Sequence, residues 1–394
     1  MVAAELSPLA KVGGLADVVP SLAGSLQDKG FPCRVIMPKY GFIKEEEFGL
    51  ERFKQGVKVD TGGEEQEVNI WWTRLSSGVG VYLIENQEYF GGEKIYWGSE
   101  PERFLFFSQA VLEILPLVEF RVDVIHCHDF HTALLPAFLS LRREQNEFYR
   151  IPSVYTIHNL NYQGKTDIED IVEGEVTEDL LKSLSRDPEK GEINFMAQGI
   201  IHADMVTTVS STYSREITEA SQGAGLEKVT AENKEKIIGI INGIDTEEFD
   251  PQRDKDIFHT YSRENLEPKK ENKIQLQRKA GLPEDENVLL VGFISRLVWQ
   301  KGIDIIGEEL MKLNAQFLFL GTGTKKYEQK LKSLSQKYPR KVSSQILFDG
   351  KLAKQIYAGS DIYLLPSRFE PCGLGQMIAM SYGTVPVVRN TGGL

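Results

Sequence analysis

Cysteine is scarce in this chain: three residues, Cys33, Cys127 and Cys372, among 394. Three cysteines provide neither a disulfide framework nor a paired set of zinc ligands, which indicates a reducing compartment. Long hydrophobic runs are also missing, because no stretch approaches the roughly 18 to 20 apolar residues of a membrane-spanning helix. The first residues show no basic segment followed by an apolar core, the mark of a secretory signal. We therefore expect an intracellular protein that does not use a membrane.

Positive charge is in deficit, with 45 lysines and arginines against 57 aspartates and glutamates and a formal net charge of -12. Such an average surface repels the phosphate backbone that dominates nucleic-acid binding. We therefore expect no nucleic-acid partner. A small anionic ligand is still compatible with the sequence, because a few clustered cations in a cleft override the mean field.

Internal repeats and low-complexity tracts are absent. What recurs is a short β-branched apolar run, a turn rich in Gly, Asn, Asp or His, and a segment of helical period, which is typical of an α/β fold with a parallel sheet. The first series of candidate strands is 33–37, 79–84, 122–127, 153–157, 205–209 and 237–241. The second series is 288–294, 316–320, 345–348, 361–365 and 385–388.

The length of the chain indicates two domains. A polar, charged, proline-bearing stretch at 245–287 separates the two series of strands and is predicted to be the domain connection. We place the boundary at residue 245, which gives domains 1–245 and 246–394. Residues 57–72 indicate a β-hairpin with a Gly-Gly turn, and residues 166–194 a polar helical excursion.

The unusual residues gather just after the candidate strands, where open α/β sheets bind their ligands. In KVGGLADVV, Gly13 and Gly14 precede a helical run, so backbone N–H groups can approach an anion while Lys11 adds a positive charge. A plain tight turn explains such a glycine pair equally well. The Gly-Thr-Gly at 321–323 is a weak candidate for a phosphate loop, because it lacks the full spacing of a dinucleotide-binding fingerprint.

The segment ISRLVWQKG carries two cations in one loop after a buried strand. Arg296 and Lys301, five residues apart, suit a clamp for a diphosphate whose charge grows as it leaves. The alternative is a pair of solvated surface cations, which the preceding apolar strand disfavours.

The segment SRFEPCGLGQ places Glu370 just before a helix expected to start near Gly373, with Pro371 forcing the turn. The backbone amides of Cys372, Gly373 and Leu374 are then free to hydrogen-bond sugar hydroxyls. In the alternative interpretation Glu370 caps the helix and offsets its macrodipole. We do not expect Cys372 to be a nucleophile, because no neighbouring residue offers it a base.

The HCHDFH motif suggests a metal site at first sight. Its acid, Asp129, comes one residue too early for a His-x-His-x-Asp-His ligand set, so we expect no metal. His126 and Cys127 are predicted as core residues at a strand end, while Asp129 and His131 face the ligand or cap the next helix. His158, in TIHNLNYQG, ends another buried strand, where a lone histidine is either structural or presents its ring or carbonyl to a sugar carbon.

Taken together, these motifs resemble the bacterial glycogen synthase and plant starch synthase family, glycosyltransferase family 5. The segments occur in the family's order along the whole chain: KVGGLADVV, HCHDFHTAL, YTIHNLNYQG, INGID, SRLVWQKGID, PSRFEPCGLGQ and VRNTGGL. The resemblance implies the α/β GT-B architecture, with two Rossmann-like, doubly wound parallel-sheet domains facing each other across a cleft. The first domain would be the glucan acceptor side and the second would bind the nucleotide sugar.

The resemblance further implies retaining transfer of glucose from ADP-glucose to the non-reducing end of an α-1,4-glucan, with release of ADP. ADP-glucose and the glucan are the expected partners, and neither a metal nor another cofactor is expected. The expected compartment is the cytoplasm, or the plastid stroma if the source is a plant or alga.

The roles of individual residues follow from the same resemblance. Arg296 and Lys301 would hold the diphosphate, and Asp129 would lie at the transferred glucose with His158 beside its anomeric carbon. Glu370 would grip the donor sugar together with nearby backbone amides. The remaining substrate-binding residues are Lys11, Gly13, Gly14, Asp17, Asn159, Asn242, Phe348, Cys372, Gly373, Leu374, Thr391, Gly392 and Gly393.

Within that set, the loop of Lys11, Gly13 and Gly14 would lie near the donor phosphates and the acceptor sugar, with Asp17 supporting it. The segment 391–393 would close on the phosphates. No strong acid is needed if two cations and several amides take up the developing negative charge. Same-face attack through an ion-pair-like intermediate is expected, because no carboxylate stands out as a covalent nucleophile.

The sequence departs from the family pattern at three points. It lacks nearly all of the strand expected before Ala3 and the C-terminal segment expected to brace the first domain, so we expect a chain truncated at both ends. Related glycosyltransferases often carry a second Glu eight residues after Glu370, where this chain has Ile378; this difference fits the synthases. Phe348 is a candidate for stacking on the nucleotide base, and the choice between ADP-glucose and UDP-glucose stays open on residue chemistry alone.

Three alternatives compete with this assignment. One is another retaining GT-B transferase with a different donor, or with a lipid or small-sugar acceptor. A second is a non-catalytic fragment that binds a nucleotide sugar or a glucan. The third, a dehydrogenase, is disfavoured because no G-x-G-x-x-G opens the first strand-helix unit.

Overall fold

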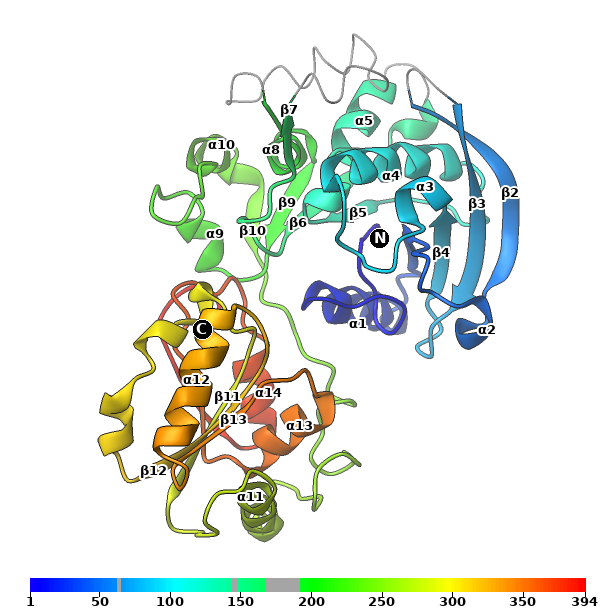
Figure 1. Cartoon of the computed structure of the whole chain (residues 1–394). Helices are drawn as coiled ribbons and strands as arrows, with labels where there is room; N and C mark the ends of the chain where they lie inside the picture. Colours follow the sequence, from blue (N-terminus) through cyan, green and yellow to red (C-terminus); the bar gives the residue numbers. More distant parts are fainter. Residues whose placement is uncertain (62–64, 144–146, 168–191) are drawn as a thin grey trace. The chain divides into compact units, whose positions relative to one another are not determined.

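The computed structural model describes residues 1–61, 65–143, 147–167 and 192–394. It divides into two compact units, Met1–Ile241 and Asn242–Leu394 (Figure 1). Each unit is an α/β structure. The predicted helical excursion at 166–194 lies almost entirely outside the described residues, and its two ends form the short antiparallel pair β7 (Lys165–Asp167) and β8 (Glu192–Asn194).

Strands of the first unit form two four-stranded arrays in the orders β1-β4-β3-β2 and β10-β9-β6-β5. The array from β5 to β10 is parallel throughout, as is the pair of β1 and β4. The chain start connects the arrays, because Val2 bridges Ile36 and Cys127 in parallel. Their bounds are β1 Arg34–Pro38, β2 Glu51–Asp60, β3 Glu65–Arg74, β4 Gly80–Glu85, β5 Ile125–His128, β6 Ser153–Ile157, β9 Met205–Thr208 and β10 Ile237–Gly239.

The predicted hairpin at 57–72 is confirmed by the antiparallel pair of β2 and β3, which is longer than expected. β3 also pairs antiparallel with β4, so the parallel sheet carries an antiparallel edge. Mixed sheets of this kind are common among large α/β folds.

Helices pack against these strands and bury an apolar face. In α1 the buried residues include Leu15, Val19 and Ala23, spaced by four as a helix requires. α4 is buried along most of its length and packs against α5 and the 3-10 turn η1 (Phe130–Thr132). The bounds are α1 Leu15–Asp28, α2 Glu45–Phe48, α3 Gln87–Phe90, α4 Glu100–Ile114, α5 Leu135–Arg142, α8 Phe195–His202, α9 Tyr213–Glu216 and α10 Glu227–Glu232, with 3-10 turns η2 Glu147–Tyr149 and η3 Lys234–Lys236.

The second unit contains a five-stranded parallel sheet in the order β13-β12-β11-β14-β15. In chain order this is 3-2-1-4-5, the arrangement of a Rossmann sheet, in which the ligand crevice lies where the order reverses. The strands are β11 Leu289–Ile294, β12 Ala315–Leu320, β13 Val342–Gln345, β14 Ile362–Leu365 and β15 Val385–Val388. The helices are α11 Glu267–Lys279, α12 Lys325–Lys337, α13 Gly350–Gly359 and α14 Gly375–Ser381, with 3-10 turns η4 Trp299–Lys301, η5 Ile303–Ile305 and η6 Glu308–Lys312.

One predicted strand, 345–348, is wrong by three residues. Strand β13 ends at Gln345, and the apolar residues Leu347 and Phe348 that suggested the strand lie beyond it and are exposed. The tertiary pairing of Val342 with Phe317 sets the register instead.

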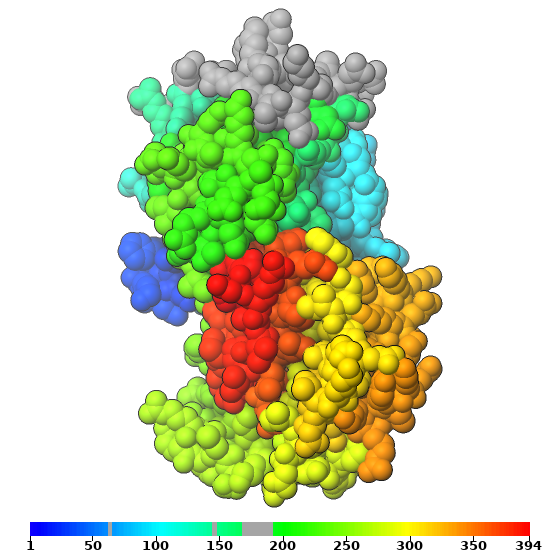
Figure 2. All heavy atoms as spheres, turned by 90° about the vertical axis from the view of Figure 1, so that its left-hand side faces the viewer, coloured from blue at the N-terminus to red at the C-terminus, as the bar shows by residue number. Residues whose placement is uncertain are grey.

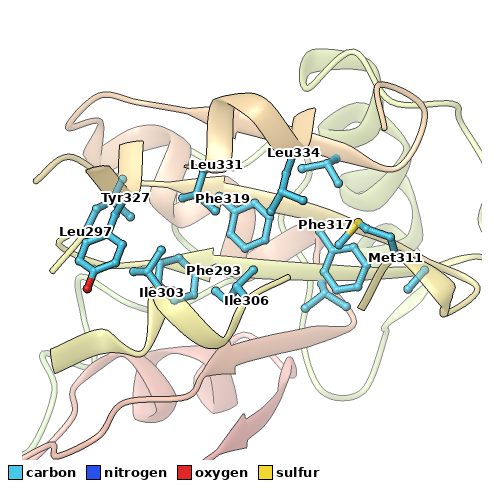
Figure 3. Packing of buried hydrophobic residues seen from close by; sticks show 13 residues of the cluster. Phe293, Leu297, Ile303, Ile306, Met311, Phe317, Phe319, Tyr327, Leu331 and Leu334 are labelled. Atoms are coloured by element: carbon cyan, nitrogen blue, oxygen red, sulfur yellow. The ribbon is translucent and has the colours of Figure 1, made fainter. Parts of the chain in front are cut away.

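Side chains on both faces of this sheet are buried. Phe317 and Phe319, two residues apart on β12, lie on one face and pack with Phe293, Leu331 and neighbouring side chains (Figure 3). Full burial of one such side chain stabilises the fold by about 1.5–3 kcal/mol. Leu318 and Leu320 point the other way, into a cluster with Leu276 and Leu352 of α11 and α13.

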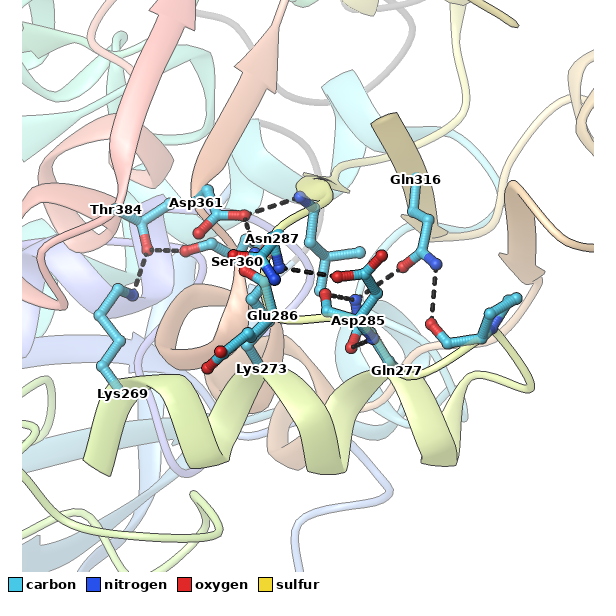
Figure 4. A network of polar contacts seen from close by, with 12 residues as sticks. Lys269, Lys273, Gln277, Asp285, Glu286, Asn287, Gln316, Ser360, Asp361 and Thr384 are labelled. Atoms are coloured by element: carbon cyan, nitrogen blue, oxygen red, sulfur yellow. Dashed lines mark hydrogen bonds and ion pairs between the residues drawn. The ribbon is translucent and has the colours of Figure 1, made fainter. Parts of the chain in front are cut away.

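Polar contacts attach α11 to the sheet (Figure 4). Lys273 Nζ lies 2.8 Å from Asp361 Oδ2, and the same carboxylate oxygen accepts a hydrogen bond from Leu290 N. Lys269 donates to Ala358 O and Thr384 Oγ1, each at 2.8 Å, and its burial lowers its pKa to about 8. Residues 245–287, predicted as a domain connection, therefore contain a helix that is built into the second unit.

Across the described ranges, every helix is too short or too polar to span a lipid bilayer. Figure 2 shows the C-terminal part of the chain, coloured red, at the surface of the second unit.

Candidate active site

The loop that leads into α1 is organised by a buried carboxylate, Glu5. Glu5 Oε2 accepts hydrogen bonds from the backbone amides of Val12, at 2.7 Å, and Gly13, at 2.8 Å. The hydroxyl of Tyr96 donates to the other oxygen, Oε1. The carboxylate of Glu5 therefore accepts hydrogen bonds from two of the backbone amides that sequence reasoning assigns to a ligand anion.

Glu5 and Tyr96 were not predicted as site residues. Glu5 had a signal in the sequence, since it is the one acidic residue in the otherwise apolar start MVAAELSPLA. No signal in the sequence pointed to Tyr96, because its contact with Glu5 spans 91 residues of sequence.

Lys11 lies on this loop with its Nζ 2.6 Å from Asp17 Oδ1, and both side chains are partly exposed. Gly14 is the residue before α1 and has φ -67°, so no left-handed conformation demands a glycine there. Among the described residues, and apart from its chain neighbours, a Cβ built on Gly13 would meet only Glu5 Oε1 within 4 Å, at 3.9 Å. The space beside Gly13 is thus open to a ligand, and Asp17 orients Lys11 next to it.

Asp129 follows β5 and links the end of that strand to the end of β6 by hydrogen bonds. Its φ of 55° is a left-handed conformation, which costs a non-glycine residue about 1–3 kcal/mol and is typical of functional sites. Asp129 Oδ1 accepts the backbone amides of His158, at 2.7 Å, and Asn159, at 3.3 Å. Burial raises the pKa of Asp129 to about 7, against the lowering effect of these amides, and the charge of Glu5 adds to the rise.

Three histidine rings meet at the ends of β5 and β6. His128 Nδ1 lies 3.0 Å from His158 Nε2, and the ring centroids of His126 and His128 are 4.1 Å apart. His126 Nε2 contacts Thr156 Oγ1 at 2.6 Å. Burial lowers the pKa of His158 to about 4 and that of His126 to about 3, and it lowers the pKa of His128 as well. All three rings are therefore neutral at pH 7, and sequence analysis did not single out His128.

His131 lies inside the turn η1 and does not cap a helix. It is buried, and its ring centroid lies 3.9 Å from that of Phe130 and 4.6 Å from that of Phe104. Neither ring nitrogen has a hydrogen-bond partner among the described residues, and burial lowers its pKa to about 3. The described part of the chain also has no group of three or more His, Cys, Asp or Glu side chains placed to hold a metal ion.

In the second unit, Lys301 Nζ lies 2.5 Å from Glu370 Oε2, and the two side chains are 14% and 10% exposed. Ser367 Oγ donates to the same carboxylate oxygen at 2.8 Å. The alternative role of Glu370 as a helix cap is wrong, because α14 begins at Gly375 and has no side-chain capping bond. Helix α14 therefore begins two residues later than predicted. Arg296, the other predicted cation, is exposed.

Backbone contacts hold the loops of Lys301 and Glu370 against each other. Arg368 N donates to Gln300 O at 2.7 Å, and Gln300 Nε2 donates to Phe369 O at 3.2 Å. Gly302 has φ 69°, and a Cβ there would lie 2.2 Å from Pro366 O. A glycine is thus required for the two loops to approach this closely.

The segment 391–393 packs on the segment that follows Glu370. Gly393 N donates to Glu370 O at 3.0 Å. A Cβ on Gly392 would lie 1.9 Å from Glu370 O, and one on Gly393 would lie 2.0 Å from Cys372 O. The structure therefore brings Glu370, Cys372 and the Thr-Gly-Gly segment into one packed group.

Burial raises the pKa of the Cys372 thiol to about 11, and a hydrogen bond from the Asn242 backbone opposes the rise. The thiol is therefore protonated at neutral pH, which is unfavourable for a nucleophile. The same contact places Asn242 beside this group.

The remaining candidate residues of the second unit do not belong to the packed group around Glu370. Phe348 is 85% exposed beyond the end of β13. The Gly-Thr-Gly at 321–323 is explained by packing, since Cβ atoms on Gly321 and Gly323 would lie 1.9 Å from Ser295 O and 2.4 Å from Leu297 O. Ile378 is buried in an apolar cluster, so a glutamate at this position would lie in that cluster and not in a site.

Two cavities lie within single units. One of about 370 Å³ in the first unit is lined by apolar residues such as Phe31 and Val118, and none of the predicted site residues borders it. One of about 310 Å³ in the second unit borders Gly302, Pro366 and Arg368, next to the Lys301 loop.

Comparisons with known proteins agree along the whole chain. Residues 1–232 match the starch synthase catalytic domain family, and residues 272–394 match glycosyl transferases group 1. Glycogen synthase 2 of Geobacter sulfurreducens is 44% identical over 100% of this chain and 83% of its own length. Glycogen synthase of Moorella thermoacetica is 42% identical over 100% of this chain and 81% of its own length.

Among solved structures, the catalytic domain of starch synthase IV from Arabidopsis thaliana, bound to ADP and acarbose, has a TM-score of 0.91. It is 34% identical, and the match covers 100% of this chain and 83% of that one. Sucrose-phosphate synthase from Thermosynechococcus elongatus shares the fold, with a TM-score of 0.59 at 16% identity.

The two α/β units, with polar groups at the carboxyl ends of their parallel strands, define a glycosyltransferase of the GT-B class. More narrowly, the chain belongs to the glycogen synthase and starch synthase family of glucosyltransferases.

Proposed function

We propose that this chain transfers glucose from ADP-glucose to the non-reducing end of an α-1,4-glucan, with retention of configuration and release of ADP. The observation that carries the proposal is the similarity, over the whole chain, to a starch synthase catalytic domain that binds ADP and acarbose. Relatives named glycogen synthase support it. The three free cysteines support a reducing compartment such as the cytoplasm.

The first unit, in this proposal, binds the acceptor and the transferred glucose. Asp129 holds the backbone of His158 and Asn159 in a fixed place, so it acts as a support and not as a nucleophile. His158 meets the transferred glucose. Lys11, kept in place by Asp17, contributes a positive charge beside the open space at Gly13.

The second unit binds the nucleotide sugar. Arg296 and Lys301 neutralise the diphosphate as its charge grows, which is the electrostatic work that a metal ion performs in other transferases. Glu370 accepts hydrogen bonds from sugar hydroxyls, and the backbone of Cys372, Gly373 and Leu374 adds further contacts. Thr391, Gly392, Gly393 and Asn242 complete the donor site, and the exposed ring of Phe348 is available for stacking on the base.

Retention follows if the acceptor attacks on the face that the ADP leaves. Glu370 is paired with Lys301 and Asp129 is engaged by two amides, so neither carboxylate is free to form a covalent intermediate. An ion-pair-like intermediate stabilised by Arg296 and Lys301 is consistent with this arrangement.

The test is the rate of ADP release from ADP-glucose, compared with UDP release from UDP-glucose, with and without glycogen. Glycogen-dependent release that prefers ADP-glucose supports the proposal. Hydrolysis without glycogen would point to a different acceptor. Binding of ADP-glucose to folded protein without turnover would favour a nucleotide-sugar-binding protein instead.

A further inference from the structure

The inner neighbour of His158 determines which of its ring nitrogens carries the proton. His128 Nδ1 lies 3.0 Å from His158 Nε2, and both rings are neutral at pH 7 because burial lowers both pKa values. A neutral imidazole carries one proton, so one ring must donate in this hydrogen bond and the other must accept. Only two arrangements are therefore open to the pair.

The protonation state of the second ring nitrogen of His128, Nε2, distinguishes the two arrangements. His128 Nε2 is buried and has no hydrogen-bond partner in the described part of the chain. If His158 Nε2 donated to His128 Nδ1, the proton of His128 would sit on this buried nitrogen as an orphaned N–H group. If His128 Nδ1 donates instead, the buried nitrogen is an unprotonated acceptor. Orphaned donors are rarer in protein interiors than unsatisfied acceptors.

The surroundings of the pair leave no third arrangement. The backbone amide of His128 donates to Thr132 Oγ1, so that hydroxyl does not serve the ring. The ring of His126 is tilted by 32° to that of His128, with 4.1 Å between the ring centroids, and its Nε2 contacts Thr156 Oγ1. Among the described residues, His158 is thus the hydrogen-bond partner of the His128 ring.

We infer that His128 is a positioning residue that donates from Nδ1 to His158 Nε2 and so fixes His158 in the tautomer with its proton on Nδ1. His158 is partly exposed, and Nδ1 is the ring nitrogen left for a ligand. His158 then presents a neutral N–H donor, not a base. Resting on the proposed function, this donor takes a hydroxyl oxygen of the transferred glucose, which makes the contact specific for a sugar oxygen with a free lone pair.

The tautomer can be measured without substrate, so its test is separate from that of the proposed function. The full chain is labelled with ¹⁵N-histidine, and long-range ¹H–¹⁵N correlation spectra are recorded at pH 7.5. With six histidines in the chain, the His158 signals are identified by their loss in His158→Gln. We expect a protonated Nδ1 and an unprotonated Nε2 on His158. A protonated Nε2 on His158 would overturn the inference.

Two variants of His128 separate positioning from packing. In His128→Asn the side-chain amide falls near the position of Nδ1, and in His128→Gln it falls near the position of Nε2. We expect His128→Asn to keep the His158 tautomer and most of the kcat/KM. We expect His128→Gln to lose the single tautomer and to lower kcat/KM on the order of 10-fold to 100-fold, the size seen when outer groups that orient a histidine are removed.

Melting temperatures provide the control. A purely structural role for His128 would lower both Tm and kcat/KM in parallel, and equally for Asn and Gln, and that outcome contradicts the inference. If the unchanged protein shows no glucosyl transfer, the proposed function fails while the spectra still decide the tautomer.

Discussion

Lys301 and Glu370 form a largely buried ion pair, with 2.5 Å between Nζ and Oε2 across 69 residues of sequence. Each charge offsets the cost of burying the other, and removal of one partner leaves the second uncompensated. The pair also places a cation and a carboxylate side by side, and our proposal assigns the cation to the diphosphate and the carboxylate to the sugar hydroxyls of the donor.

Lys301→Ala is expected to lower kcat on the order of 100-fold to 1,000-fold, because in our proposal it removes a cation that stabilises the negative charge developing on the diphosphate. The measurement is ADP release from ADP-glucose with glycogen, alongside Tm. Lys312→Ala, which removes a cation from an exposed pair with Glu309, is the matched control and should change neither value. Normal turnover in Lys301→Ala would remove this lysine from the phosphate role.

The double variant Lys301→Met with Glu370→Gln tests whether the pair serves only stability. It removes both charges, so Tm should recover relative to Lys301→Ala. Activity should stay low. Recovery of both would show that the ion pair is structural.

Asp129→Asn is expected to stabilise the protein relative to the original chain as pH rises. The pKa of Asp129 is raised from 3.8 to about 7 by burial, so the folded state keeps a proton that the unfolded state has released in this window. Stability is therefore lost as pH rises from about 4 to 7, by about 1–4 kcal/mol. Asn keeps the oxygen that accepts the His158 amide but has no charge. Urea unfolding at pH 5 and pH 8 measures the difference, and an equal effect at both values would contradict it.

His131→Phe is expected to protect the protein against acid. Burial lowers the pKa of His131 from 6.5 to about 3. Below pH 6.5 the unfolded state therefore binds a proton that the folded state does not bind, and the free energy of unfolding falls as pH falls from 6.5 to about 3. At pH 5 the loss is about 2 kcal/mol, and the variant lacks it. Urea midpoints at pH 7.5 and pH 5 give the comparison. His259→Phe, at an exposed position, serves as the control. A gain for His131→Phe that is no larger at pH 5 than at pH 7.5 would refute the prediction.

Gly392→Ala is expected to destabilise the protein by more than about 1–3 kcal/mol and to abolish most activity. Gly392 has φ 52°, and the new Cβ would lie 1.9 Å from Glu370 O. Gly307→Ala is the control, because apart from its chain neighbours no heavy atom of the described residues lies within 4 Å of its Cβ, and its φ is extended. Both are compared by Tm and ADP release, and similar values for the two variants would exclude this close contact.

EDTA is expected to leave glucosyl transfer unchanged, since Arg296 and Lys301 take up the charge of the departing diphosphate in our proposal. Initial rates with EDTA, and with EDTA followed by excess Mg²⁺, test this. A loss that Mg²⁺ restores would show that a metal takes part.

The amino-acid sequence was enough to predict the α/β class, most strands, the hairpin of β2 and β3, and the family, because these depend on local periodicity and on motifs in order along the chain. It also located Lys301 and Glu370 at the ends of buried strands. Local pattern failed at β13, where pairing with β12 overrode the apolar run at Leu347 and Phe348.

Which side chains meet could be seen from the folded structure alone. Glu5 and Tyr96 are 91 residues apart, and His128 and His158 are 30 apart, so no local pattern could pair them. Burial, which no spacing reveals, then set the neutral state of the histidines and the raised pKa of Asp129. The physical reason is that local sequence dictates conformation, while charge state and hydrogen-bond partners depend on which distant segments exclude water from the site.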